Sequence, residues 1–308
     1  MYIAILDFGT NTFNLLIANA GDDNKLNIIH TSKQAVKLGK GGINKGIIQE
    51  DAFERGLKAI ENHLITIRQY PVKKIYAFAT SAIRSAANGK DFVNEVKKRY
   101  DIYVNTIPGE REAELIYKGV RQSLDLGRTQ ALILDIGGGS NEFIIADNKK
   151  ISWKHSYDLG MARMLEKFKP HDPIKTSEII KIEAYFEKEL QSLFDAVQIY
   201  EPAYMIGASG SFETFSALLA GLFPEKYKLN PTPVHEIYPD DYRKLHNILI
   251  SSTIETRKQM PGMEPVRVEM IVLASIFVNF TIAQCKFEKV LQSDYSLKEG
   301  IIAEMLNI

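Results

Sequence analysis

The 308-residue chain has a single cysteine and no excess of charge of either sign. Lys plus Arg and Asp plus Glu each number 38, so the formal net charge is zero. That balance argues against a general nucleic-acid coat or a membrane-surface protein, because both need a basic surface. Cys285 cannot close an intrachain disulfide, and its apolar, helix-like surroundings favour a buried, inert thiol over a nucleophile.

Long apolar runs and targeting signals are scarce as well. The longest apolar stretch, 270–283, is too short to span a bilayer and contains Asn279. The apolar N-terminus has no basic segment and carries Asp7, so it does not read as a signal peptide. The six histidines show no metal-ligand spacing, and no Ser-His-Asp or Cys-His order stands out. We therefore expect a cytoplasmic protein that binds neither nucleic acid nor membrane.

What the chain does have is one short pattern that occurs twice. Asp7-Phe-Gly-Thr-Asn11 closes a first apolar run, and Asp135-Ile-Gly-Gly-Gly-Ser-Asn141 closes another. Glycine lets backbone N–H groups approach phosphate oxygens, the hydroxyl adds a donor, and the carboxylate can hold Mg²⁺ directly or through water. A tight β-turn is the alternative for the first copy. Three consecutive glycines in the second copy weaken a structure unless the backbone must approach something closely. Two copies predict two similar lobes that face one phosphate site.

Both halves of the chain repeat one order of predicted elements, β-β-β-α-β-α with further β and α segments after it. In the first half, strands are expected at 2–6, 13–18, 26–30, 75–79 and 103–107, and helices at 51–68, 90–100 and 110–124. In the second half, strands are expected at 131–136, 143–146, 151–157, 203–206 and 289–292. Helices are expected at 177–197, 211–219, 242–252, 267–284 and 297–306.

This order separates the chain into two domains. A break in the pattern at 126–130 predicts an N-terminal lobe over 1–125 and a C-terminal lobe over 126–308. It also excludes a doubly wound dinucleotide fold, in which a helix follows the first strand.

Two further segments carry residues suited to phosphate chemistry. Small and hydroxyl residues surround Arg84 at 79–88, where a guanidinium can give bidentate bonds to phosphate, or the segment is simply a capped loop that enters a helix. Glu110, Arg111 and Glu112 stand where a strand ends and a helix begins. Acidic residues in a first helical turn are ordinary helix-dipole features. A carboxylate there can also orient and deprotonate a water for attack on phosphorus.

These segments, in this order, resemble the exopolyphosphatase/guanosine-pentaphosphate phosphohydrolase family, which belongs to the superfamily of sugar kinases, actin and heat-shock chaperone ATPases. The segments that carry the resemblance are Asp7 to Thr12, Thr80 to Asn88, Pro108 to Ala113, Asp135 to Glu142, Leu159 to Arg163, Gly207 to Ser211, Met260 to Arg267 and Leu297 to Gly300. The resemblance implies an α/β, two-lobed actin-like ATPase or ribonuclease H-like fold with duplicated βββαβα domains. In such a fold the last helix, about 297–308, packs back on the N-terminal lobe.

The resemblance also implies a role for individual residues, by motif position. The glutamate that activates water falls on Glu112. Asp135 and Glu142 match acidic residues expected to hold the divalent ion, and Asp7 is the weaker third candidate. The phosphate-binding positions fall on Gly9, Thr10, Asn11, Arg84, Gly138, Gly139 and Ser140. The segment 207–211 resembles a loop that borders the nucleotide site in the superfamily's ATPases.

The implied activity is release of terminal orthophosphate from inorganic polyphosphate with Mg²⁺ or another divalent cation. Three alternatives stay open: hydrolysis of the 5′-γ-phosphate of guanosine pentaphosphate, a small-molecule kinase of the same superfamily, and a non-enzymatic, ligand-binding or filament-forming relative of actin. Long family members carry additional helical domains that resemble a grip on long chains, so we expect a preference for short polyphosphate. A homodimer through the C-terminal helices and a monomer are equally compatible with the apolar pattern.

The chain departs from the family pattern in three places and adds a basic segment. A usual Glu-Glu pair reads Arg111-Glu112, the closing Leu-Arg-Glu-Gly carries Lys298 in place of arginine, and Glu269 replaces the usual aspartate after the Pro-Gly segment. The basic segment, 31–49, contains four lysines and no acid. The lysines are either an exposed basic loop or a guide for the distal phosphates of the substrate: Lys33, Lys37, Lys40 and Lys45.

Overall fold

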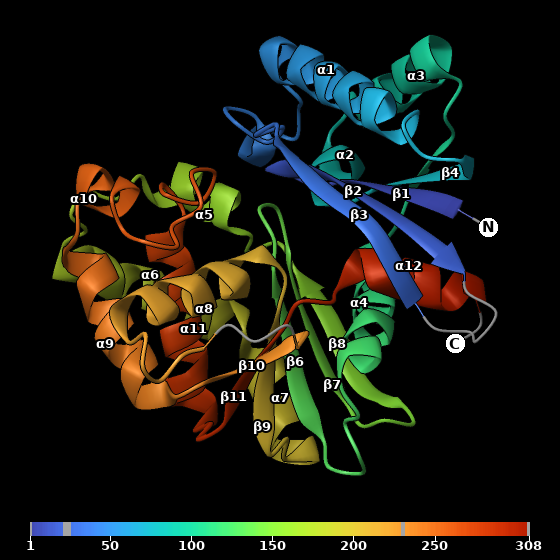
Figure 1. Ribbon diagram of the computed structural model, residues 1–308. Coiled ribbons are helices and arrows are strands. Elements are labelled where there is room, and N and C mark those ends of the chain that lie inside the picture. The colour runs from blue at the N-terminus through green and yellow to red at the C-terminus, as the bar shows by residue number, and fades with distance from the viewer. Residues whose placement is uncertain (1, 21–25, 229–231, 307–308) are drawn as a thin grey trace.

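Two mixed β-sheets organise the chain, one in each half (Figure 1). The computed structural model describes residues 2–20, 26–228 and 232–306. The first sheet has the order β3-β2-β1-β4-β5. Its strands are β1 (Tyr2–Phe8), β2 (Thr12–Ala20), β3 (Leu26–Ala35), β4 (Val72–Ala79) and β5 (Val104–Thr106). The first three strands are antiparallel, whereas β4 and β5 are added in parallel and therefore need helical crossovers.

The second sheet repeats this arrangement with one extra edge strand. Its order is β10-β11-β9-β6-β7-β8, so the antiparallel meander is again followed by two parallel strands. The strands are β6 (Ala131–Ile136), β7 (Asn141–Ala146), β8 (Ile151–Tyr157), β9 (Tyr204–Ala208), β11 (Val290–Ser293) and the antiparallel edge strand β10 (Val234–Ile237). The repeated strand order agrees with the duplication expected from the sequence.

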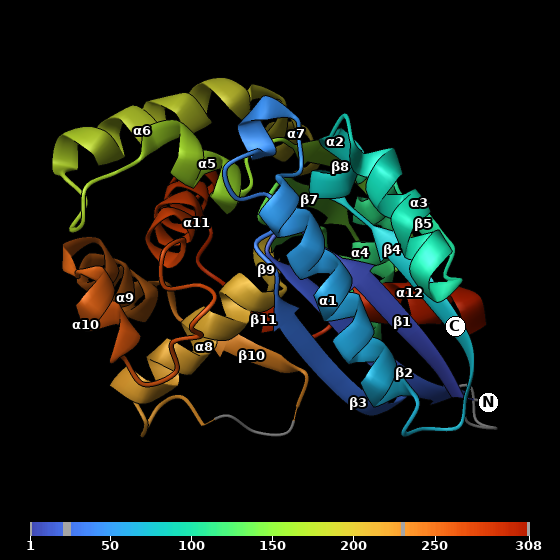
Figure 2. The same cartoon turned by 90° about the horizontal axis from the view of Figure 1, so that it is seen from above.

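Helices cover one face of the first sheet. Two further helices form a layer between its other face and the second sheet. Figure 2 shows α1 and α3 across one face, with the 3-10 turn and short helix that flank them. These elements are the turn at Ile43–Lys45, α1 (Glu50–Ile67), α2 (Ser81–Ser85) and α3 (Gly89–Tyr100). Alternate residues of β1 pack toward α1 and α3, while Ile3 and Ile5 face the layer between the sheets.

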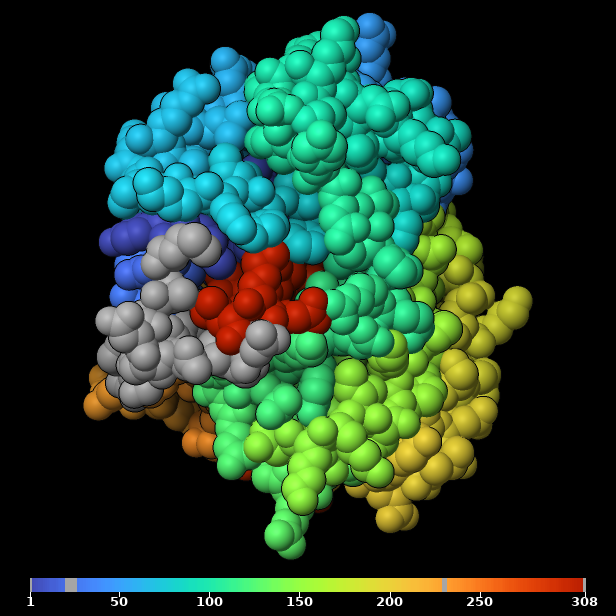
Figure 3. Space-filling view, turned by 90° about the vertical axis from the view of Figure 1, so that its right-hand side faces the viewer, coloured from blue at the N-terminus to red at the C-terminus, as the bar shows by residue number. Residues whose placement is uncertain are grey.

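The layer between the sheets consists of α4 (Gly109–Ser123) and α12 (Leu297–Leu306). The end of the chain returns to this layer, and Figure 3 shows it in red at the junction of the two lobes. The two helices touch backbone to backbone, because a Cβ on Gly300 would overlap the Leu115 carbonyl of α4 and a Cβ on Gly119 would overlap the carbonyl of Ser296, directly before α12. The described part of the last helix therefore contacts α4 and β1, and residues 307–308 of the expected helix lie outside the described range.

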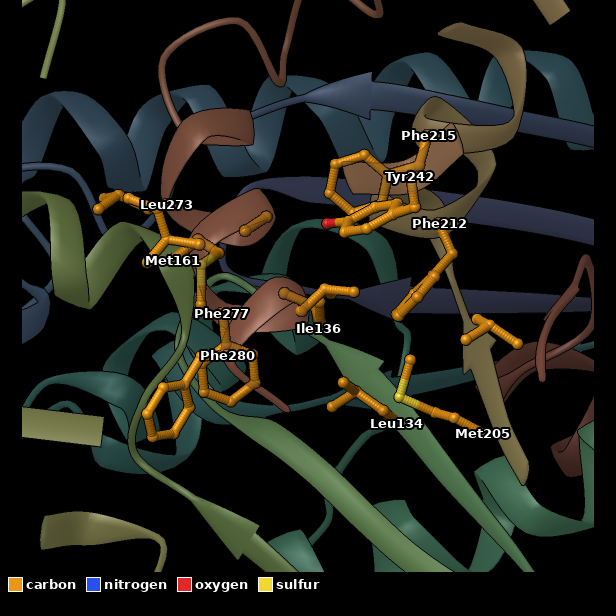
Figure 4. Close-up of a cluster of buried hydrophobic side chains, with 14 of the residues drawn as sticks. Leu134, Ile136, Met161, Met205, Phe212, Phe215, Tyr242, Leu273, Phe277 and Phe280 are labelled. Atoms are coloured by element: carbon orange, nitrogen blue, oxygen red, sulfur yellow. The ribbon is translucent and has the colours of Figure 1, made fainter. Parts of the chain in front are cut away.

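The remaining helices surround the apolar helix α11 in the second lobe. They are α5 (Met161–Phe168), α6 (Thr176–Glu189), α7 (Gln191–Tyr200), α8 (Gly210–Leu222), α9 (Pro239–Ser251), α10 (Ile254–Lys258) and α11 (Ile271–Cys285). Because α11 is apolar on nearly all sides, it is buried in the core. Its Phe277 packs edge-on against Phe186 with ring centroids 4.8 Å apart, in the cluster drawn in Figure 4.

Several elements differ from the sequence-based expectation. The single helix expected over 177–197 is two helices, α6 and α7, which meet at Leu190. The apolar spacing continues through the break and gives no sign of it. The backbone also stays hydrogen-bonded there, because Leu190 N–H donates to Phe186 O and Leu193 N–H donates to Leu190 O. The strand expected to end at residue 30 continues to Ala35 because β2 offers a partner along its whole length. The short elements α2, α5, α10 and β10 were not anticipated.

Among the described residues, no helix combines the length and apolarity needed to cross a membrane. Cys285 at the end of α11 is partly buried, and burial raises the pKa of its thiol to about 12, which agrees with an inert side chain.

Candidate active site

A pocket of about 540 Å³ lies between the lobes, with both Asp-Gly turns on its wall. Each turn joins the first two antiparallel strands of its sheet. Gly9 N–H donates to Thr12 O at 3.0 Å, and Gly137 N–H donates to Ser140 O at 3.1 Å, so the two turns close with the same hydrogen bond. The duplicated motif therefore has the same backbone design in both lobes.

The strand register shows how the two copies differ. Asp7 lies opposite Asn14, whereas Asp135 lies opposite Glu142. In the first copy the Asn14 amide donates to Asp7 Oδ2 at 2.9 Å, so the pair carries one negative charge. In the second copy both positions are acidic.

The lobes meet at the glycines of the second turn. A Cβ on Gly139 would lie 2.5 Å from Ser81 Oγ and 2.7 Å from Thr10 Oγ1, both of the first lobe. A Cβ on Gly138 would overlap the Asn11 amide. Glycine is therefore required here for the close approach of the two lobes, independently of any ligand.

Glu112 enters the pocket from the first turn of α4. Its side chain is 11% exposed, and Arg84 Nη1 donates to its Oε2 at 2.9 Å. The same guanidinium nitrogen donates to Ile107 O at 3.0 Å, and Nη2 lies 3.4 Å from Ser140 Oγ in the second lobe. Arg84 thus orients the glutamate and links it to the second turn.

Glu142 and Asp135 are held by hydroxyl groups. Glu142 Oε1 accepts hydrogen bonds from Ser140 and Ser156, each at 2.7 Å, and the residue is 1% exposed. Asp135 accepts a hydrogen bond from Ser296 and lines the pocket. Asp7 also lines the pocket, and its Oδ1 is buried without a hydrogen-bond partner among the described residues.

Burial raises the pKa of all four members of this carboxylate cluster, Asp7, Glu112, Asp135 and Glu142. Burial raises the pKa of Asp135 to about 6. Burial and the charge of Asp135 raise the pKa of Glu142 to about 7. The pKa of Glu112 lies well above its ordinary value, raised by burial and by Glu142, although Arg84 opposes the shift. A cation near these groups would relieve the repulsion.

The negative charge of the pocket wall also favours binding of a cation. Of the residues that the structure describes, six acidic and three basic side chains line it: Asp7, Glu112, Asp135, Glu213, Asp294, Glu299, Lys33, Arg267 and Lys298. No three His, Cys, Asp or Glu side chains of the described residues are arranged to hold a metal by themselves. Mg²⁺ is usually bound by one or two carboxylates together with substrate phosphates. The unpaired Asp7 oxygen and the acidic excess fit that kind of site.

Comparison with known proteins identifies the family. The model described as the Ppx/GppA phosphatase family matches residues 16–308. The chain belongs to the Ppx/GppA phosphatase family.

Named relatives of this Ppx/GppA chain include exopolyphosphatases. It is 34% identical to an exopolyphosphatase from Cytophaga hutchinsonii of known crystal structure, with a TM-score of 0.96 over 100% of this chain and 98% of that one. It is 24% identical to exopolyphosphatase 1 of Mycobacterium tuberculosis over 100% of this chain and 89% of the relative. It is 30% identical to the bifunctional 3-dehydroquinate synthase/phosphatase of Fusobacterium nucleatum, over 90% of this chain but only 42% of that protein's length. The expected two-lobed α/β fold is confirmed.

Most of the residues expected from the sequence lie on the pocket wall of the Ppx/GppA chain: Asp7, Gly9, Thr10, Asn11, Glu112, Asp135, Gly138, Gly139 and Ser140. Two expected residues do not. Glu142 lies behind Ser140, and Arg84 is directed to Glu112 instead of into the pocket.

The residues that the family pattern left in doubt are also placed. Arg111 pairs with Glu114 and Glu304 and lies off the wall. Lys33 lines the pocket, on β3 and not in a loop. The other three lysines of the basic segment are not on the wall, and Lys37 pairs with Glu269 of the second lobe at 2.8 Å.

Other wall residues were not singled out as site residues from the sequence. Ser209, Arg267 and Lys298 lie in segments that carry the family resemblance, which was the available signal. Ser209 has φ 67° and ψ 179°, a conformation that costs about 1–3 kcal/mol for a residue other than glycine. Such strain is found mainly at functional sites, but nothing in the local sequence predicts it.

Proposed function

We propose that this Ppx/GppA chain is an exopolyphosphatase, which releases terminal orthophosphate from short inorganic polyphosphate by attack of water. The main support for the proposal is the position of Glu112, whose buried carboxylate lies on the same pocket wall as both Asp-Gly turns. The exopolyphosphatase names of the similar proteins support the substrate class. Glu110 in the same helical turn is a poorer candidate for the base, because its side chain is 49% exposed and pairs with Lys154.

The terminal phosphate would lie between the two turns. Backbone N–H groups at Thr10 and Gly138 and the hydroxyl of Thr10 supply donors from both lobes. Donors fixed in advance by the fold stabilise charge on the transferred phosphoryl group, and most of the rate enhancement in phosphoryl transfer comes from such positioning and charge neutralisation.

Glu112 would accept a proton from the attacking water. Burial and the charge of Glu142 raise its pKa, which makes the carboxylate a stronger base. Arg84 holds Oε2, which leaves the other oxygen to orient the water. In this proposal Arg84 positions the base, and the phosphate is bound mainly by the turns.

Mg²⁺ would be held by Asp135 and Asp7, with Glu142 behind Ser140 adding negative charge to the site. When bound, the ion supplies neutralisation of the phosphate oxygens. The acidic excess of the pocket wall supports this assignment, since a polyphosphate would otherwise meet a wall of its own sign.

A substrate panel tests the proposed function. Purified protein with Mg²⁺ is assayed for phosphate release from tripolyphosphate, from polyphosphates of graded length and from guanosine pentaphosphate, and for ATP consumption with small acceptors. We expect the highest kcat/KM with short polyphosphate. A preference for guanosine pentaphosphate, acceptor-dependent ATP use, or nucleotide-dependent assembly without turnover would each replace the proposal with the corresponding alternative.

A further inference from the structure

Lys298 is a cation of the pocket wall whose ammonium group is not hydrogen-bonded to any of the described residues. It is the second residue of α12, is half-buried, and lines the pocket between the lobes. Among the described residues its side chain takes part in no hydrogen bond and no ion pair. A half-buried ammonium without a bound counter-charge is unfavourable, because it loses hydration and gains no directed contact in return.

The two other basic side chains of the wall are already engaged. Lys33 forms ion pairs with Glu264 and, at 3.8 Å, with Glu213. Arg267 Nη1 donates to Ser211 Oγ at 3.1 Å, and its Nε lies 3.5 Å from Glu264 Oε2. Of the three cations on the described pocket wall, Lys298 is therefore the one that forms no ion pair.

The position of Lys298 in its helix is also electrostatically unfavourable. The first turn of a helix carries partial positive charge, which favours acidic and disfavours basic side chains. Its neighbour Glu299 follows the ordinary rule and accepts the Ser296 N–H. A residue that breaks a local rule without a compensating contact is more often found at a functional site than elsewhere.

The surroundings keep Lys298 charged and place it near both turns. Burial lowers its pKa, but the negative charges of Glu299, Asp7, Glu213 and Asp135 outweigh this, so the pKa is raised. Two of those acids, Asp7 and Asp135, are the penultimate residues of the strands that lead into the two Asp-Gly turns. Ser296, two residues before Lys298, is hydrogen-bonded to Asp135 and fixes the start of α12 against the second turn.

We propose that Lys298 is a phosphate-binding residue, whose ammonium donates to the oxygens of the terminal phosphate between the two Asp-Gly turns. This inference rests on the proposed function for its substrate class. The side chain would contribute one positive charge to the site in addition to the divalent cation, and it would bind the released orthophosphate as well as the terminal phosphate of the chain.

The test is binding of inorganic phosphate in the presence of Mg²⁺, measured by calorimetry on the full chain. K298M should weaken binding about tenfold or more, the size expected for loss of one charge-assisted hydrogen bond. K298R should bind within about threefold of the wild type, because it keeps the charge. The matched control is K181M, which removes an exposed lysine of α6. Binding by K298M within twofold of the wild type, or no binding of phosphate by the wild type, would overturn the proposal.

A second measurement uses the wild-type protein and does not depend on the folding of a variant. Reductive methylation of lysines is followed by mass spectrometry with and without phosphate and Mg²⁺. Lys298 should be protected by the ligand and Lys181 should not, and equal modification of Lys298 in both samples would contradict the inference.

Neither measurement involves turnover, so the two proposals can fail separately. Protection of Lys298 in a protein that releases no phosphate from polyphosphate would refute the proposed function alone. Rapid polyphosphate hydrolysis with unchanged phosphate binding by K298M would refute the role of Lys298 alone.

Discussion

Replacing Glu142 with glutamine removes one charge from the carboxylate cluster and changes little else. The carboxylate is almost fully buried and accepts hydrogen bonds from Ser140 and Ser156. The side-chain oxygen of glutamine can accept the same bonds, and the volume is conserved. The variant therefore isolates the effect of negative charge behind the pocket.

The magnitude follows from the pKa of Glu142, which rises from an ordinary value of 4.5 to about 7 on folding. Because the folded pKa is raised, this contribution to stability is complete below pH 4.5 and is lost as pH rises through 7. One pKa unit corresponds to about 1.36 kcal/mol. Between pH 5 and pH 8 linkage predicts that the free energy of unfolding falls by about 2–3 kcal/mol through this group.

The assay is urea unfolding of the metal-free protein at pH 5 and pH 8. E142Q should gain about 2–3 kcal/mol on the wild type between the two pH values, since it cannot ionise. The control E187Q changes an exposed glutamate of α6 and should follow the wild type. Mg²⁺ at pH 8 should stabilise the wild type more than E142Q. If E142Q shows the same pH-dependent loss as the wild type, the reasoning about buried charge is wrong.

Three further predictions concern contacts around the site and the core. Because a Cβ on Gly139 would lie 2.5 Å from Ser81 Oγ, G139A should separate the turns and lower kcat/KM at least about tenfold, and adding S81G should recover part of the loss in steady-state assays. F277A removes a fully buried ring and should lower the free energy of unfolding by about 3–5 kcal/mol in urea titrations; a loss below 1 kcal/mol would contradict the packing. Since Arg84 lowers the pKa of Glu112, R84M should move the acidic limb of the pH–rate profile to higher pH, and an unmoved limb would show that Arg84 does not act through Glu112.

The parts of the fold that the sequence predicts are those with local signals. Apolar runs of strand length, helical spacing and glycine turns recover the repeated element order, because each depends on residues close in the chain. The contact of α12 with α4 depends instead on Gly119 and Gly300, which are far apart in sequence and give no local sign of a helix–helix contact. The turn between α6 and α7 keeps its hydrogen bonds and apolar spacing, so no breaker marks it.

In the candidate site, too, local sequence predicts some residues, whereas the direction of others depends on distant segments. Both Asp-Gly turns and Glu112 reach the pocket because a strand end or a helix start fixes where they lie. The direction of a long side chain is a tertiary property, and Arg84 turns to Glu112 because that carboxylate arrives on α4, a later crossover. Lys33 likewise takes its partner, Glu264, from the other lobe. Side-chain pairs between residues far apart in the sequence could therefore not be predicted from the sequence.

The most direct test of the account is phosphate release from tripolyphosphate by E112Q in the presence of Mg²⁺. E110Q is the matched control, because it changes a half-exposed glutamate of the same helical turn. The account predicts that E112Q lowers kcat by a factor of about 10²–10⁴, the range expected for loss of a general base, with a cooperative unfolding transition and nearly unchanged binding of inorganic phosphate. E110Q should keep most of its activity. A wild-type rate in E112Q would contradict the claim that Glu112 activates the attacking water.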